Sequence, residues 1–181
     1  MPAPRTSPPV RQVGTLLDRH PASQLVVFVP RVQLGTALRQ AVARRRGATA
    51  GLRVTTVERY AHTLASLSLR AEGRTELASG PQLFLAEQVI RSLPEDQQNA
   101  LTGGQPLSGL LAPLARTFVT LRTHAVSPDA YHQQVADSPR RAAQATAFAR
   151  YEAKLEERGH YDTADVLDRA QALVASSEVD L

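Results

Sequence analysis

The first 75 residues alternate short apolar runs with longer segments in which apolar residues recur every three to four positions. Leu25–Val29 is a continuous, largely β-branched run ended by Pro30, a pattern typical of a strand buried on both faces. Leu52–Thr56 is a second strand candidate. Helical periodicity precedes, separates and follows these strands, in residues 10–19, 31–46 and 57–67. Strands and helices that alternate with short joints predict a parallel sheet with right-handed crossovers.

Beyond about residue 76 the strand signals end and the pattern becomes helical. A polar stretch, Pro94–Gln105, predicts a loop after the first of these helices. Pro113 predicts that the next helix either starts near Gly109 or kinks. The predicted helices cover residues 80–93, 107–121, a short segment opened by Ser127-Pro128, 138–158 and 162–174. The fold class predicted is therefore α/β and mostly helical overall.

Asp162 and Asp165 stand at the start of the last predicted helix. Their spacing could form a carboxylate pair or a magnesium site, but it also lets Asp162 cap the helix and Asp165 meet the positive end of its dipole. We favour capping. The histidines lack H-E-x-x-H and other paired metal spacings, so we expect ordinary surface or helix-end residues and predict no metal or other cofactor. They are His20, His62, His124, His132 and His160.

The composition narrows the class of protein. With 181 residues, of which 43% are hydrophobic, the chain can bury a core without staples. The sequence has no cysteine, which excludes disulfides, thiolate metal sites and a cysteine nucleophile. The N-terminus lacks a signal-peptide pattern, and no run approaches the roughly 18 apolar residues of a membrane span. We expect a cytoplasmic protein with no membrane partner.

The basic residues favour a polyanionic partner. The formal net charge is +4, and every basic residue except Lys154 is arginine, which pairs with phosphate bidentately. An alternative is that the arginine content reflects genomic base usage. Arg44, Arg45 and Arg46 end a predicted helix, where they complement its dipole and could also meet phosphates.

Two common kinds of catalytic site are missing from the sequence. No G-x-x-x-x-G-K-[ST] occurs, and Lys154 lies in a charged helical stretch, so we do not expect this chain to hydrolyse ATP by itself. An ATP-using enzyme would need an unusual phosphate site. No G-x-S-x-G elbow supports a serine hydrolase.

Three ordered segments carry a family resemblance: Leu25-Val-Val-Phe-Val-Pro30 with Gln33, then Arg53-Val-Thr-Thr-Val-Glu-Arg-Tyr-Ala61, then Gly159-His-Tyr-Asp-Thr-Ala-Asp-Val-Leu-Asp168. In this order they resemble the N-terminal helicase-like domain of AddB/RecB-type subunits of superfamily 1, the UvrD-like helicase-nucleases. The likeness covers residues 10 to 175.

The resemblance implies a partial RecA-like (P-loop NTPase-like) parallel sheet with a large helical subdomain of the 1B type. The implied domains are a partial RecA-like core at 10–75, the 1B-like insertion at 76–158 and a return helix to the core at 159–181. The four prolines of residues 1–9 predict a disordered tail before them.

Carried over by position, Thr56 matches the Thr or Ser that meets a DNA phosphate in active relatives, and Tyr60 matches the residue that packs behind it. Arg31 stands where the family has glutamate, and Glu58 stands where active motors have histidine. Residues 1–15 lack Gly-Lys-Thr, and the chain ends at Leu181 before a motif II strand. We therefore expect a degenerate or truncated motor domain.

The function expected is that of a non-hydrolytic helicase-like module of an AddB-like exonuclease subunit in DNA repair and recombination. It would act as a scaffold that binds the DNA backbone, single-stranded or at a duplex end, and could contact a partner helicase-nuclease subunit. In such proteins the nuclease chemistry resides in a C-terminal PD-(D/E)XK domain, which this sequence does not contain. The candidate DNA-binding residues are Arg31, Gln33, Thr55, Thr56, Arg53, Arg59, Arg44, Arg45 and Arg46. The alternative is a protein–protein interaction module that does not bind nucleic acid.

Overall fold

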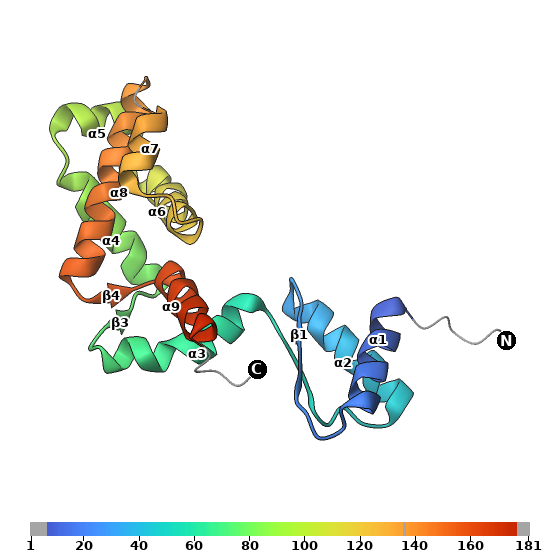
Figure 1. Cartoon of the computed structure of the whole chain (residues 1–181). Helices are drawn as coiled ribbons and strands as arrows, with labels where there is room; N and C mark the ends of the chain where they lie inside the picture. Colours follow the sequence, from blue (N-terminus) through green and yellow to red (C-terminus); the bar gives the residue numbers. More distant parts are fainter. Residues whose placement is uncertain (1–6, 136, 177–181) are drawn as a thin grey trace. The chain divides into compact units, whose positions relative to one another are not determined.

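The computed structural model describes residues 7–135 and 137–176, which are mostly helical (Figure 1). The chain forms two compact units, residues 1–60 and 61–181. The boundary between these compact units falls inside helix α3 (Val57–Ala71), because most of α3 packs with elements of the second unit. No helix in the described residues combines the length and apolar character that crossing a bilayer requires.

The first unit contains the predicted parallel strands. β1 (Leu25–Phe28) pairs in parallel with β2 (Leu52–Thr55), in a register that joins Leu25 to Leu52 and Phe28 to Thr55. Helix α2 (Val32–Arg46) connects them, and Gly47 ends it with a φ of 76°, a left-handed conformation that suits glycine. The predicted strand–helix–strand unit is confirmed.

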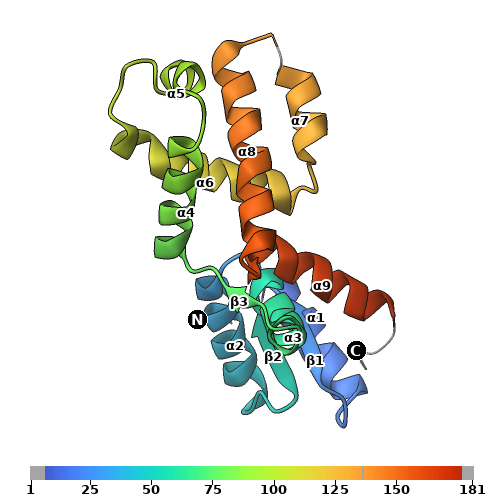
Figure 2. The same ribbon diagram turned by 90° about the vertical axis from the view of Figure 1, so that its left-hand side faces the viewer.

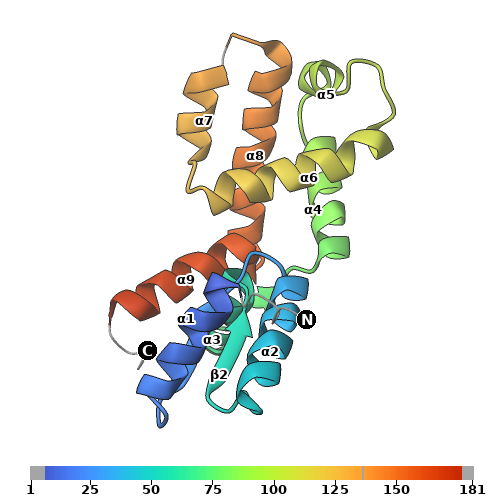
Figure 3. The ribbon, with the colours of Figure 1, turned by 90° about the vertical axis from the view of Figure 1, so that its right-hand side faces the viewer.

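Helices α1 (Pro8–Arg19) and α2 cover one face of this sheet and lie side by side in Figure 3. Val42 of α2 is completely buried against Val13 and Leu17 of α1. Gly35 brings α2 close to the sheet, since a Cβ atom there would lie 3.1 Å from Val54 Cγ1. The core of the first unit thus lies between two helices and one sheet face.

Several expectations for the first unit need correction. Leu25–Val29 is not buried on both faces: the first three residues of β1 are half-buried and Phe28 is 49% exposed. Helix α1 begins at Pro8, so two residues of the expected tail are helical, because proline is tolerated in a first helical turn. Residues 1–6 lie outside the described part. A large RecA-like sheet is not seen in the described residues, whose sheets are two parallel pairs.

The second unit is a helical bundle inserted between two very short strands. Its strands β3 (Thr75–Glu76) and β4 (His160–Tyr161) pair in parallel. Between them come α4 (Ser79–Arg91), α5 (Glu95–Thr102), α6 (Leu107–Thr123), α7 (Pro128–Val135) and α8 (Pro139–Glu157), and after them α9 (Thr163–Ala175).

Helix α8 is the centre of the bundle, and α4, α5, α6 and α7 all contact it (Figure 2). Its buried side carries alanines in the first half, followed by Phe148, Tyr151 and Leu155. Phe118 of α6 stacks on Phe148 with ring centroids 5.8 Å apart and lies 5.3 Å from the ring of Tyr151. All three rings are completely buried.

A second apolar cluster joins α3, β4 and α9. Ala65 and Leu69 of α3 pack with Tyr161 of β4 and with Val166 and Ala170 of α9. Through this cluster the last predicted helix packs against α3. No local pattern indicated β3 and β4, because two-residue strands have no measurable periodicity.

Two expectations for the bundle need refinement, of which the second concerns only where α6 starts. The stretch Pro94–Gln105 is not only a loop, since it contains α5, whose Leu101 is buried and whose Gln98 Nε2 donates to Leu93 O at 2.7 Å. Helix α6 begins at Leu107 and continues through Pro113, which lies inside it. The predicted helix starts at Pro128 and Pro139 are confirmed.

We predict that Phe118→Ala lowers the free energy of unfolding by about 3–5 kcal/mol, because it leaves a cavity among packed rings. Phe84→Ala is the matched control. Phe84 is 59% exposed, so its truncation should change stability by no more than about 0.5 kcal/mol. Denaturant unfolding followed by circular dichroism measures both. Equal losses in the two variants would contradict this description of the core.

Candidate functional site

The carboxyl ends of β1 and β2 gather part of the predicted DNA-binding set. The ladder continues beyond the strands, since Val29 N donates to Thr55 O at 2.9 Å. Arg31 and Thr56 then precede the first turns of α2 and α3. Adjacent strands lie about 4.8 Å apart, so both helix starts lie at one end of the sheet. Arg31 and Gln33 are exposed there.

The two threonines differ in what they can offer a ligand. Thr56 is half-buried, and its Oγ1 accepts a hydrogen bond of 3.3 Å from Arg59 N. A hydroxyl that accepts one bond can still donate its own hydrogen, so Thr56 can cap α3 and bind an anion. Thr55 is buried, and its hydroxyl donates to Thr56 O at 3.4 Å. Thr55 therefore supports the strand end and is not presented at the surface.

Two aromatic rings and an arginine lie beside this end of the sheet. Phe28 meets Tyr60 edge to face, with ring centroids 5.3 Å apart and planes at 75°. The Arg53 guanidinium lies 5.3 Å from the centre of the Tyr60 ring. Tyr60 thus packs between Phe28 and Arg53. The sequence pattern assigned Phe28 to a buried strand and missed its exposed ring.

Arg44, Arg45 and Arg46 lie away from this group. They form the last turn of α2, whose 15 residues place them about 20 Å from Arg31. Arg46 is also engaged, because its Nη2 lies 2.7 Å from Asp18 Oδ1. The predicted DNA-binding residues therefore fall into two sets. One set comes from β2, α3 and the start of α2, and the other, Arg44 to Arg46, lies at the end of α2.

The two units differ strongly in formal charge. Residues 1–60 contain ten arginines and only two acidic residues, Asp18 and Glu58, which gives +8. Since the whole chain carries +4, residues 61–181 carry −4. The chain's net charge hides this contrast. The first unit alone has the charge density that attracts polyanions.

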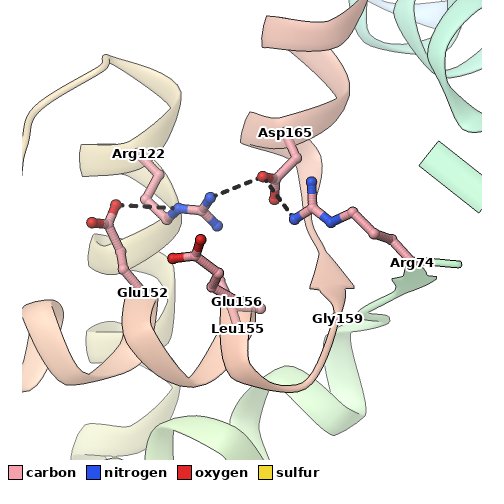
Figure 4. Close-up of a pocket in the computed structure, with 7 residues that line it drawn as sticks. All are labelled: Arg74, Arg122, Glu152, Leu155, Glu156, Gly159 and Asp165. Atoms are coloured by element: carbon pink, nitrogen blue, oxygen red, sulfur yellow. Dashed lines mark hydrogen bonds and ion pairs between the residues drawn. The ribbon is translucent and has the colours of Figure 1, made fainter. Parts of the chain in front are cut away.

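A second group of charged side chains lies inside the second unit (Figure 4). Arg122, in the last turn of α6, is only 14% exposed. Its Nη1 lies 2.8 Å from Asp162 Oδ2, its Nη2 lies 3.2 Å from Asp165 Oδ1, and its Nε lies 3.3 Å from Glu152 Oε1. Arg74 Nη2 lies 3.1 Å from the same Asp165 oxygen.

The two aspartates also cap α9, as the sequence predicted. Asp162 Oδ1 accepts from Ala164 N at 2.9 Å, and Asp165 Oδ2 accepts from Asp162 N at 2.9 Å. This is a reciprocal capping box. No local pattern indicated Arg122 as a partner of these aspartates, because 40 residues separate it from Asp162.

Burial and neighbouring charges shift the pKa values of these groups in different directions. Burial raises the pKa of Asp162 and of Glu152 above their ordinary values, although Arg122 opposes the shift. For Asp165 burial also favours the neutral form, but the Arg122 charge and hydrogen bonds from Asp162 N and Arg74 outweigh it and lower the pKa. Burial lowers the pKa of Arg122, and the three carboxylates more than compensate, so that pKa is raised.

A cavity of about 490 Å³ opens beside this cluster (Figure 4). Its charged lining consists of Arg74, Arg122, Glu152, Glu156 and Asp165. Within the described residues, no group of three or more histidine, cysteine, aspartate or glutamate side chains is placed to hold a metal ion. His62 of α3 pairs with Glu76 at 3.1 Å. The charged cluster around Arg122 joins α6 and α8 to the start of α9.

Comparisons of this chain with protein-family models, with curated proteins and with solved structures found no match.

We predict that Asp165→Asn makes the free energy of unfolding less dependent on pH in the acidic range. The folded pKa of Asp165 lies below the ordinary value of about 3.9, so on acidification the unfolded chain binds this proton first. The ionised Asp165 stabilises the folded chain at pH values above the pKa that this residue has in the unfolded chain. This stabilisation is lost as the pH falls through the pKa of Asp165 in the folded chain. Urea unfolding at pH values from about 3 to 7 measures the effect. Asp129→Asn, at an exposed position in the first turn of α7, is the control. An unchanged acid dependence in Asp165→Asn would contradict the assignment.

Proposed function

We propose that this chain is a non-hydrolytic helicase-like module of an AddB-like subunit in DNA repair and recombination, and that its first unit binds the DNA backbone. The observation that carries the proposal is the charge of that unit: its formal charge is +8, whereas the rest of the chain is acidic. Phosphate contacts supply most of the affinity of sequence-independent DNA binding.

The carboxyl end of the β1–β2 sheet is the surface on which a phosphate fits best. The first turn of α2 contains no acidic residue, and Arg31 at its start has no side-chain hydrogen bond to the helix. The positive end of the helix dipole and the Arg31 guanidinium can therefore act on the same phosphate oxygens. The Thr56 hydroxyl can donate to the next phosphate along the strand.

Duplex ends and single strands both present the backbone that this surface would bind. Two observations support binding of the DNA backbone at this surface. Three segments resemble those of AddB-type subunits in the same order along the chain, and the first unit contains a parallel strand–helix–strand unit. In proteins of the AddB type the nuclease chemistry resides in a C-terminal PD-(D/E)XK domain, and this module could also contact a partner helicase-nuclease subunit.

We predict that the chain binds single-stranded oligonucleotides with an affinity that falls steeply as salt increases from about 50 to 200 mM. Arg31→Ala should weaken binding for every sequence and reduce the salt slope by about one. Fluorescence anisotropy of a labelled oligothymidylate measures both quantities. The control is Arg116→Ala, at an exposed position in the acidic second unit.

The triple variant Arg44→Ala, Arg45→Ala, Arg46→Ala separates the two ends of α2. If the strand ends form the interface, the triple variant keeps more affinity than Arg31→Ala. A salt-independent signal, or a loss confined to the triple variant, would refute the proposed interface.

A second candidate function is a protein–protein interaction module without nucleic-acid binding. The observation that favours it is a set of large apolar residues in the first unit of which about half the surface or more is exposed. They are Phe28, Val32, Leu34 and Val57, at 49%, 52%, 52% and 58% exposure. Exposed apolar patches often mark interfaces.

Size-exclusion chromatography with light scattering discriminates these functions. The interaction module predicts that the wild-type chain self-associates or depends on a partner, that it ignores DNA, and that Val32→Ser with Val57→Ser restores a monomer by removing apolar surface. A monomeric wild-type chain that binds DNA would contradict it.

A further inference from the structure

The second unit consists of two parts joined by two short segments. The bundle is α4–α8, residues 79–157, and the base is residues 61–76 of α3 and β3 together with 160–176 of β4 and α9. Leu77–Ala78 leads into the bundle, and Arg158–Gly159 leads out of it. These segments flank paired strands, because Thr75 N donates to Gly159 O and Leu77 N to Tyr161 O, both at 2.8 Å. Two adjacent connections form the geometry of a hinge.

The apolar packing of the bundle includes Leu77 of the hinge but does not join that of the base. The buried cluster of the bundle and the buried cluster of the base share no residue among those described. Helix α6 of the bundle contacts α9 of the base. Two cavities lie at that contact, of about 490 and 220 Å³, and both are lined by Arg122 and Glu152. The contact is therefore polar and incompletely filled.

Arg122 spans the contact. Its guanidinium comes from the bundle, and its ion pairs with Asp162 and Asp165 reach the base at 2.8 and 3.2 Å. The other ion pairs of this region stay on one side. Arg74–Asp165 and Arg169–Glu72 lie within the base, and Arg122–Glu152 lies within the bundle.

We propose that Arg122 is a latch that fixes the orientation of the α4–α8 bundle on the α3–α9 base, and that the bundle turns about the Leu77–Ala78 and Arg158–Gly159 hinge when the latch is open. The fixed orientation follows from one fork-shaped cation that holds two carboxylates on a single helix start. Gly159 has a φ of 60°, a conformation that few other residues adopt at such a joint.

The absence of cysteine from the sequence makes the orientation directly measurable. Asn99→Cys in α5 and Gln171→Cys in α9 place spin labels at exposed positions on the bundle and the base. Pulsed electron–electron resonance then reports the distribution of distances between the labels. With Arg122 present we expect one narrow distribution.

Arg122→Met should broaden this distribution by several ångströms or split it, while the helix content measured by circular dichroism is retained. Arg74→Met is the matched control, because it removes a partner of the same Asp165 carboxylate without crossing the hinge. It should leave the distribution narrow. Broadening in Arg74→Met equal to that in Arg122→Met would overturn the proposal.

Arg122→Lys keeps the charge but cannot hold two carboxylates in a fork, and it decides the matter if Arg122→Met fails to fold. A broadened distribution in the folded lysine variant supports the latch. A distribution as narrow as that of the wild type, in either folded variant at Arg122, would overturn it.

Discussion

The second unit depends on the buried ion pairs that the Arg122 guanidinium forms with Asp162 and Asp165. Asp162 has a side chain that is 2% exposed, and a carboxylate with so little water is stable only where hydrogen bonds and opposite charge replace its hydration. Arg122 supplies the charge, and Ala164 N supplies a hydrogen bond. Removing one member of such a pair costs more than the pair contributes, because the remaining charge stays buried. The start of α9 and the end of α6 are thus fixed by one side chain.

The first unit is dominated by unbalanced positive charge and not by buried ion pairs. Its core is a small apolar layer between α1, α2 and one sheet face, and much of its polar surface consists of arginine. Little negative charge offsets those arginines, so they repel one another in the absence of a counter-ion. A polyanion would relieve this repulsion. An acidic protein face would be attracted to the same surface equally well. The exposed Phe28 and Val32 add contact area to either partner.

The sequence predicted the elements whose signals are local. The β-branched run of β1, Gly47 at the end of α2 and the Asp162–Asp165 spacing each specify a structure within a few residues, and each was confirmed. Features that depend on distant segments were missed. The exposure of Phe28 depends on how many elements cover the sheet, and the partners of Arg122 lie on another helix. Helix α5 was missed because most of its positions are polar, although Leu101 anchors it to the core.

If the chain is the AddB-like module proposed above, the residues that differ from that family's pattern determine where a phosphate would lie at the end of the β1–β2 sheet. Glu58 lies in the first turn of α3, where its carboxylate stabilises the positive end of that helix and would repel a phosphate approaching it. The first turn of α2 has no acidic residue, and Arg31 precedes it. The two positions act in the same direction, because Glu58 adds repulsion for a phosphate at α3 and Arg31 adds attraction at α2. A bound backbone would therefore be displaced from Thr56 towards Arg31, which makes α2 the stronger of the two phosphate positions.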